Sequence, residues 1–427
     1  MVVIGVALIA VYLVVGIELG RSTSLGVDFL PTYSAGMAVA DGHPAGMYER
    51  GGGLGHATIL PGHPPSAAFL NPPGAALVAA PLTRLPFAVA SVLWALLQAV
   101  LLVAGSILFR SGRPRRDLVA PAVLCLGGAW CFLDVVLGQW DGVTLLGLAL
   151  CWRWRAQDRA IAAGLALGML GGLAKPHLLV GVAVYLLVRR EWRLVLAAAA
   201  GALAVIVVPA LLLSPHLLTD FVHSMGSSGI DPLSQRFVSL GGLMYSWFGN
   251  SSLARVVGLL LSGAAVVVAG WLGTRHGGDP LRREAAVVTL SLLITPHLLG
   301  YDLVLLLPFL IAVLTDGRRR AVLVAGLLLL DAATWLDTGT ASLFPPGRLT
   351  TPLLCVFAGW WIWQSRGSVA ANATRQSLLQ AGAPGFCPYE PRGAIDSLTC
   401  AASCSTLASR LNSIIHSAIA SAAARSS

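Results

Sequence analysis

Charged residues are scarce in this sequence. They make up 11% of its 427 residues, whereas 56% are hydrophobic, and the mean hydropathy is +0.78. A soluble domain carries about a quarter charged residues, so this composition indicates a membrane protein with many crossings. The apolar runs are rich in Leu, Ala and Val and are as long as helices, not short alternating strands. We therefore expect an all-α transmembrane helical bundle.

Lysine is almost absent, and cysteine forms no recognisable pattern. Lys175 is the only lysine among 28 basic residues, and the arginines stand in short clusters between apolar runs. No continuous basic face results, so the net charge of +9 indicates membrane orientation and not nucleic-acid binding. The seven cysteines show neither metal-ligand spacing nor a disulfide framework.

The apolar runs predict about 10 to 12 transmembrane helices. Residues 2–20 lack a basic leader and a cleavage site, so we interpret them as a retained anchor helix. Residues 74–82 follow paired prolines and are too short to cross, which favours a re-entrant or interfacial segment. Further helices are predicted at residues 85–109, 118–137, 143–152, 160–174, 178–188, 194–213, 253–272, 285–296, 303–314, 321–336 and 352–363. The distribution of arginine between alternate loops places both termini in the cytoplasm.

Two polar stretches lie outside these crossings. Residues 21–69 form a large first loop that we place on the extracytoplasmic side, with a short helix at 35–40. Residues 367–427 are rich in Ala and Ser, which is typical of a disordered tail. The sequence thus predicts a transmembrane domain at 1–366 and a disordered cytoplasmic tail at 367–427.

Four polar corners fall on the same outer face in this topology. They are Asp28 after the first helix, and residues 139–141, 175–177 and 297–302. Each also has a purely structural interpretation. Lys175 could be a snorkelling anchor, His297 and Asp302 could orient a loop, and the corner at 139–141 could be part of an interfacial belt. Asp134 and Asp331 lie inside apolar runs, where a charge is costly and needs a partner or a proton.

Five short motifs occur in an order that resembles glycosyltransferase family 87, within the GT-C superfamily of polytopic enzymes. The motifs are Asp28-Phe29 with Tyr33, Asn71-Pro72-Pro73, Leu137-Gly138-Gln139, Lys175-Pro176-His177, and Pro296-His297 with Tyr301-Asp302. Where that family often has Tyr before the paired prolines, this chain has Asn71. The resemblance covers residues 16–314.

The resemblance implies transfer of a sugar from a polyprenyl monophosphate, with Asp28 as the general base and with inversion at the anomeric carbon. Lys175 and His297 would stabilise the leaving phosphate, assisted by His177 and Tyr301. The full set of expected substrate-binding residues is Tyr33, Gln139, Lys175, His177, His297, Tyr301 and Asp302. No cofactor or metal is expected, because a lipid monophosphate demands less Mg²⁺ than a nucleotide diphosphate.

The resemblance further implies an enzyme of the cell (inner) membrane with an extracytoplasmic active site. Mannose is the expected sugar, with arabinofuranose and glucose as alternatives, and the acceptor is expected to be an envelope glycolipid, lipoglycan or glycan. A secondary transporter or lipid flippase is the alternative from another class, because such proteins also carry broken helices and intramembrane charges. A membrane protein without catalysis, with Asp28 an ordinary loop charge, is the third.

Overall fold

The computed structural model describes residues 25–48, 69–108, 115–227, 237–275, 279–315, 320–339 and 347–380. Within these ranges every regular element is a helix, which confirms the all-α prediction. The expected anchor helix at 2–20 and the tail beyond 380 lie outside them.

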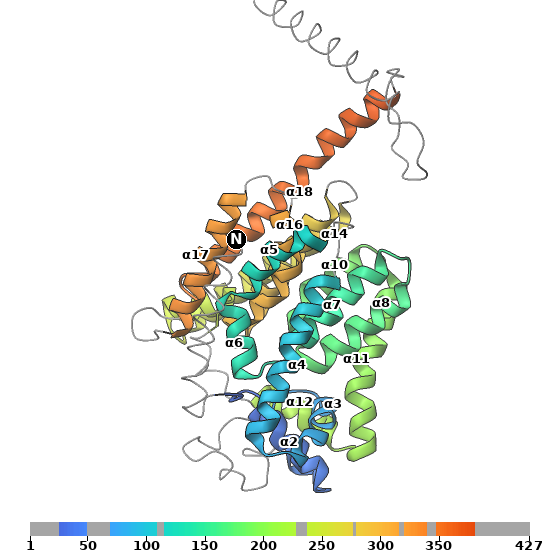
Figure 1. Cartoon of the computed structure of the whole chain (residues 1–427), viewed down its shortest axis with the longest axis vertical. Helices are drawn as coiled ribbons and strands as arrows, with labels where there is room; N and C mark the ends of the chain where they lie inside the picture. The colour runs from blue at the N-terminus through green and yellow to red at the C-terminus, as the bar shows by residue number, and fades with distance from the viewer. Residues whose placement is uncertain are drawn as a thin grey trace, which may run out of the picture. The chain divides into compact units, whose positions relative to one another are not determined.

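Most helices follow the predicted apolar runs closely, whereas α12 and α13 lie between the runs predicted at 194–213 and 253–272 (Figure 1). The first half contains α2 (Leu30–Ala40), η1 (Pro44–Tyr48), α3 (Pro73–Ala79), η3 (Ala80–Arg84), α4 (Phe87–Leu108), α5 (Arg115–Leu126), α6 (Ala129–Leu137), α7 (Asp141–Arg155), α8 (Ala160–Ala166), η4 (Leu167–Gly171), α9 (Gly172–Ala174), η5 (Pro176–Leu179) and α10 (Val180–Val188). The second half contains α11 (Trp192–Leu213), α12 (Leu217–Ser227), α13 (Leu240–Phe248), α14 (Ser252–Thr274), α15 (Pro280–Ile294), η7 (Gly300–Leu306), α16 (Leu307–Thr315), α17 (Arg320–Gly339) and α18 (Thr350–Gln380).

Three of these helices, α4, α11 and α14, are long and apolar enough to cross a membrane. The pair formed by α5 and α6 would be a fourth span, bent by 59° between Leu126 and Ala129. Shorter apolar helices occupy Ala160–Ala174, Pro176–Val188 and Gly300–Leu314. The described chain is thus a helical membrane bundle, and the count of 10 to 12 crossings stays a prediction.

One of the shorter apolar helices is interrupted, and a charged residue follows its end. The run from α8 to α9 contains a stretch of π-helix, η4, and ends at Lys175. Lys175 leaves the helical region, with φ −137° and ψ 72°, because the following Pro176 disfavours helix at the preceding residue. Bends of this kind bring polar side chains to the ends of short helices.

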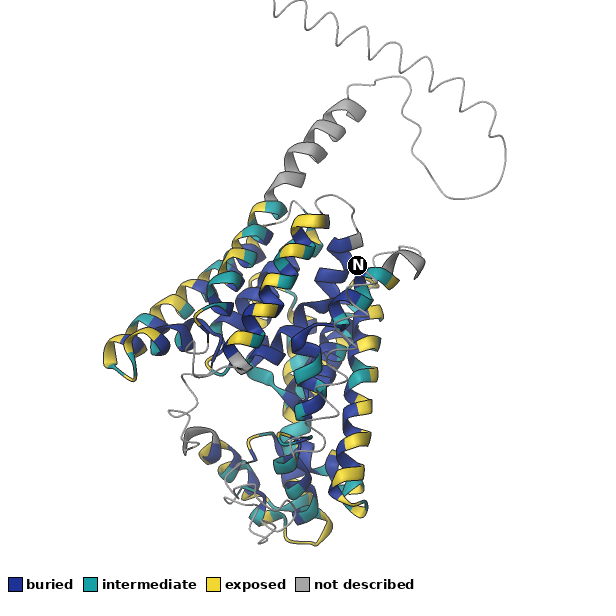
Figure 2. Cartoon of the chain, turned by 60° about the vertical axis from the view of Figure 1, so that its left-hand side comes forward, coloured by how far each residue is buried: buried dark blue, intermediate teal, exposed yellow. Residues whose placement is uncertain are grey.

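Two groups of buried apolar side chains hold the bundle together. The larger joins α7, α10, α14, α15 and α16, and the smaller joins α2 and α3 to α4. Figure 2 shows buried residues lining the interior and exposed ones on the outward helix faces. Val100 on α4 and Leu259 on α14 are among the exposed apolar residues. Segment 74–82 forms most of α3 and of η3. The residues of α3 are largely buried against α2 and α11.

The chain divides into two compact units, Met1–Arg366 and Gly367–Ser427. The boundary between the units falls within α18, which extends to Gln380, and residues 367–380 of the second unit are therefore helical. The predicted disorder of the tail otherwise falls on residues outside the described part of the chain.

Candidate active site

Asp28 lies in a turn that is fixed to the end of α6. The backbone N–H of Gly26 donates to the carbonyl of Val136 at 2.8 Å, and that of Asp28 donates to Leu137 at 2.9 Å. Gly26 has a φ of +72°, and a Cβ there would lie 2.7 Å from Oγ of Ser91. The turn therefore requires glycine at position 26, and its backbone fixes Asp28 beside the 138–139 corner.

Gly138 completes this junction from the other side. It ends α6 with a φ of +79°, a conformation that glycine adopts without steric cost. A Cβ at this position would lie 2.8 Å from Cβ of Phe29. Trp94 on α4 stacks on Phe29 with ring centroids 4.9 Å apart, and its Nε1 donates to the carbonyls of Gly138 and Gln139 at 3.1 and 3.2 Å.

The result is a direct contact between two of the predicted site residues. Nε2 of Gln139 donates to Oδ2 of Asp28 at 2.5 Å. Asp28 is exposed, but protein crowds its carboxyl group, and the loss of hydration raises its pKa above the ordinary 3.8. The amide of Gln139 and the charge of Lys175 act in the opposite direction, and Asp302 raises this pKa further. A carboxylate that is accessible and more basic than usual suits a general base.

Lys175 lies between two buried carboxylates. Its Nζ is 2.9 Å from Oδ2 of Asp141 and 2.6 Å from Oδ1 of Asp302, and it sits 4.6 Å from the ring centre of Tyr301. The Lys175 side chain is 13% exposed, whereas those of Asp141 and Asp302 are 0% and 1% exposed. An ammonium has three N–H donors, so this arrangement leaves one for a further acceptor.

Asp302 also stabilises the turn at 297–302, because its Oδ2 accepts a hydrogen bond from the backbone N–H of Leu299 at 2.6 Å. Next to it, the rings of His177 and His297 lie edge to face with centroids 6.3 Å apart. His297 further packs against Phe237, with centroids 4.9 Å apart. Burial lowers the pKa of His297, although Asp302 opposes the shift, so His297 is a neutral donor or acceptor near neutral pH.

Tyr33 is placed differently from the other expected residues. It is buried on α2, its hydroxyl donates to the carbonyl of Leu85 at 2.7 Å, and its ring packs edge-on against Phe87. The structure thus brings six expected substrate-binding residues to the corners around Asp28: Gln139, Lys175, His177, His297, Tyr301 and Asp302. Tyr33 instead packs against Leu85 and Phe87, at the start of α4.

Two acidic residues of this centre were absent from the expected set. Asp141 begins α7 and binds Lys175, and Asp134 is fully buried on α6 near enough to Lys175 and Asp141 to interact electrostatically. Asp134 lies inside an apolar run, where a carboxylate needs a partner, whereas Asp141 belongs to the corner at 139–141 that could have been part of an interfacial belt. Asp331, the other intramembrane acid, accepts from the backbone N–H of Ala129 and so satisfies the start of α6.

In the described part of the chain, no group of three or more His, Cys, Asp or Glu residues is arranged to hold a metal ion. The four cysteines of the described apolar segments, Cys125, Cys131, Cys151 and Cys355, are free thiols. Metal independence stays a prediction that needs an assay.

The family model of glycosyltransferase family 87 matches residues 69–296, more than half of the chain. The chain belongs to glycosyltransferase family 87. No curated protein and no solved structure matches it significantly. Membership identifies the chain as a membrane glycosyltransferase and favours the enzyme over a transporter or flippase.

The match covers the corners at 139–141 and 175–177 and stops one residue short of His297. Asp28 lies before it, so the role of Asp28 depends on its geometry.

Proposed function

We propose that this family 87 glycosyltransferase moves a sugar from a polyprenyl monophosphate to an envelope glycolipid or glycan, at the extracytoplasmic membrane surface. Mannose is the sugar that we propose first. The observation that carries the proposal is the position of Asp28, an accessible carboxylate held by Gln139 near a partly buried lysine with a spare donor. A base and a cation at neighbouring positions are what single-displacement transfer from a phosphate needs.

In the proposed reaction Asp28 accepts the proton of an acceptor hydroxyl. The hydroxyl oxygen forms its bond to the anomeric carbon while the bond from that carbon to the phosphate oxygen breaks. The electron pair leaves with the polyprenyl phosphate, and the proton on Asp28 later passes to water. A single displacement inverts the anomeric centre, so a β-linked donor gives an α-linked product. A positioned base of this kind contributes about 10²- to 10⁴-fold in rate.

Lys175 supports the departure of the phosphate in this proposal. Negative charge grows on the phosphate oxygens as the bond breaks, and a fixed cation that meets this charge lowers the barrier. Asp141 and Asp302 hold Nζ in place and leave its third N–H for a phosphate oxygen. His297, neutral at physiological pH, supplies a hydrogen bond and not a charge.

The experiment is a donor panel with purified protein in detergent and a pool of membrane lipids as acceptor. Radiolabelled polyprenyl-phosphate mannose, glucose and arabinofuranose are compared with the corresponding nucleotide sugars, with and without a chelator. We expect product from a polyprenyl-phosphate sugar, and the same yield with the chelator. Product from nucleotide sugars alone, after polyprenyl-phosphate synthases have been excluded, would overturn the donor class.

A further inference from the structure

The far end of α7 carries a second cluster of charged residues. Helix α7 begins at Asp141, in the candidate active site, and ends at Arg155. Fifteen residues of α-helix span about 22 Å, so Arg155 lies well away from Lys175. The proposed transfer uses none of the residues at this end.

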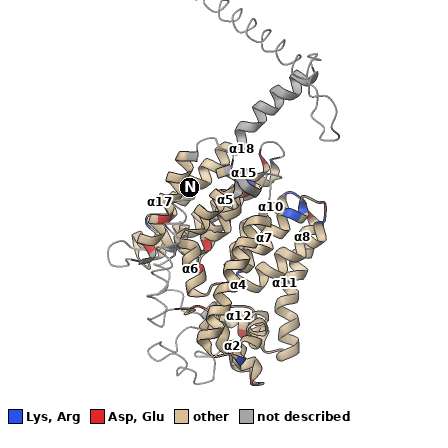
Figure 3. Cartoon of the chain, in the orientation of Figure 1, with Lys and Arg blue, Asp and Glu red and all other residues tan. Residues whose placement is uncertain are grey.

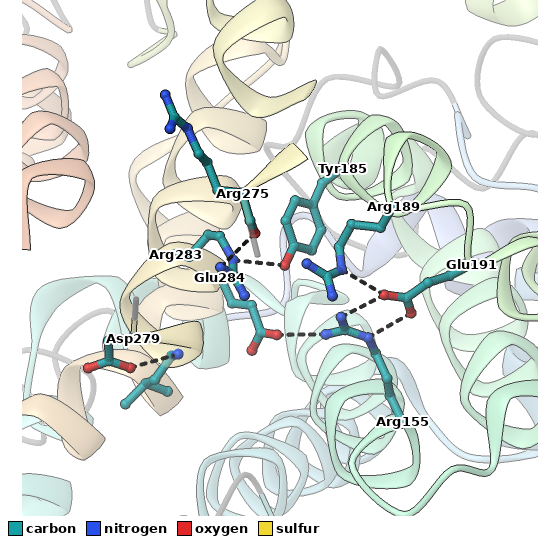
Figure 4. Close-up of polar contacts among 9 residues, drawn as sticks. Arg155, Tyr185, Arg189, Glu191, Arg275, Asp279, Arg283 and Glu284 are labelled. Carbon is teal, nitrogen blue, oxygen red and sulfur yellow. Dashed lines mark hydrogen bonds and ion pairs between the residues drawn. The ribbon is translucent and has the colours of Figure 1, made fainter. Parts of the chain in front are cut away.

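Arg155 joins two turns that are distant in sequence. It grips the carboxylate of Glu191 with Nε and Nη2, both at 2.7 Å, and its Nη1 donates to Glu284 at 2.6 Å (Figure 4). Arg189 adds a bond from Nε to the same Oε1 of Glu191 at 2.9 Å. The turn after α7 is thereby held against the turn between α10 and α11. Arginine side chains thus offset the negative charges of both Glu191 and Glu284.

Both turns are built in the same way. Each ends its helix with a left-handed residue at φ 58°, Asp158 after α7 and Arg190 after α10. In each, the next backbone N–H donates five residues back, from Arg159 to Trp154 and from Glu191 to Leu186. This is the Schellman geometry of a helix end. It fixes the backbone from which the neighbouring side chains project.

Four exposed arginines lie in and beside these two turns. Arg153, Arg159, Arg190 and Arg193 are all exposed, and we call them the arginine surface. Figure 3 shows basic residues gathered where α8 begins and α10 ends. Asp158 is the only exposed acidic residue between 153 and 193. The surface therefore carries a clear excess of positive charge.

Apolar side chains begin immediately beside the arginine surface. Trp192 is 53% exposed and Leu196, one turn further along α11, is 67% exposed. Helix α11 is one of the three helices long and apolar enough to span the bilayer, and it starts at Trp192. Trp at the start of a span marks the level of the lipid head groups. The arginines thus lie at head-group depth, where the available anions are lipid phosphates.

We propose that the arginine surface binds the phosphate of an anionic phospholipid, such as phosphatidylglycerol. Arg189, next to Arg190 in the same turn, adds a further guanidinium, whose carbon lies 5.6 Å from the ring centre of Tyr185. Basic clusters between transmembrane helices are a recurrent means of holding anionic head groups. The site is distinct from the donor site around Lys175 and does not depend on the proposed sugar transfer.

The test uses the full chain with Arg153, Arg159, Arg190 and Arg193 all changed to Gln. The matched control, Arg84→Gln with Arg255→Gln, removes exposed arginines from elsewhere, Arg255 lying near the start of α14. Each protein is titrated with phosphatidylglycerol in nanodiscs of phosphatidylcholine. Retained phosphatidylglycerol is counted by native mass spectrometry, and the Tm is recorded at each lipid fraction.

We expect phosphatidylglycerol to be retained by the wild type and the control, and to raise their Tm. We expect the fourfold variant to lose both effects, since each basic residue near an anionic lipid surface contributes about fivefold in affinity. If the fourfold variant does not fold, Arg193→Gln alone should raise the half-saturating lipid fraction about fivefold. Equal retention by variant and wild type would overturn the proposal. Equal stabilisation by soluble glycerol phosphate would overturn the lipid as the ligand.

Discussion

Asp28 is exposed, yet protein surrounds its carboxyl group closely enough to raise its pKa. Gln139 is the one side chain that donates a hydrogen bond to this carboxyl within the described part of the chain. Gln139 therefore helps to fix the position of the proposed base, and it lowers the pKa of Asp28 against the larger effect of lost hydration. Because 111 positions separate them, neither property follows from local sequence.

The pH dependence of transfer should reflect this pair. A base works only when deprotonated, so activity should be full above the raised pKa of Asp28 and should fall as the pH drops through it. Gln139 lowers this pKa, so Gln139→Met should move the acid limb of kcat/KM to higher pH. The measurement is kcat/KM against pH for both proteins. A profile that rises toward acid pH would rule out Asp28 as the base.

Lys175 should matter for folding as well as for transfer. Lys175→Met would leave the buried carboxylates of Asp141 and Asp302 without their cation, which should cost roughly 3 to 5 kcal/mol of stability. Thermal unfolding in detergent measures the loss. Adding Asp141→Asn and Asp302→Asn to Lys175→Met should restore part of the Tm. An unchanged Tm in the single variant would show that the ion pairs do not hold these corners together.

At the scale of elements, the helices were more predictable than the junctions between them. The apolar run at 85–109 became α4 at Phe87–Leu108, and the run at 194–213 became α11 at Trp192–Leu213. Hydropathy fixes such helices because a span needs about 20 apolar residues. The π-helix at Leu167–Gly171 was not foreseen, since it depends on packing against α11, where Gly168 lies against the backbone of Ala198.

The junction at Gly138 gives a direct test of how the site is assembled. Gly138→Ala must accept a φ of +79°, which costs about 1 to 2 kcal/mol, and must also displace Phe29. We expect a lower Tm and loss of transfer together, because the same junction aligns Asp28 with Gln139. The matched control is Gly263→Ala on α14, where a Cβ meets open space. A fully active, stable Gly138→Ala protein would contradict this account of the turn.

The helix end at Asp158 offers a test with the opposite sign. Asp158 holds a left-handed conformation that glycine adopts without cost. Asp158→Gly should therefore raise the stability by about 1 kcal/mol, visible as a higher Tm, and should leave transfer unchanged. A lower Tm would indicate that the Asp158 side chain stabilises the turn by more than its backbone strain costs.

At the scale of the whole molecule, the meeting of distant corners was the part that sequence could only suggest. Positive-inside counting placed the corners on one face, but their convergence depends on packing between α6, α7, η5 and η7. Asp134 showed the limit most clearly, because its cost in an apolar run signalled a partner without identifying Lys175. Membership of glycosyltransferase family 87 supplies the reaction class, and the arrangement of side chains supplies the proposed roles.

The most direct test of the central claim is the turnover of Asp28→Asn with a polyprenyl-phosphate sugar that the wild type uses. Asn has nearly the same shape and cannot accept the acceptor's proton, so we predict a normal Tm and a loss of about 10²-fold or more in kcat. Asp28→Asn that folds and turns over at the wild-type rate would contradict the assignment of Asp28 as the base.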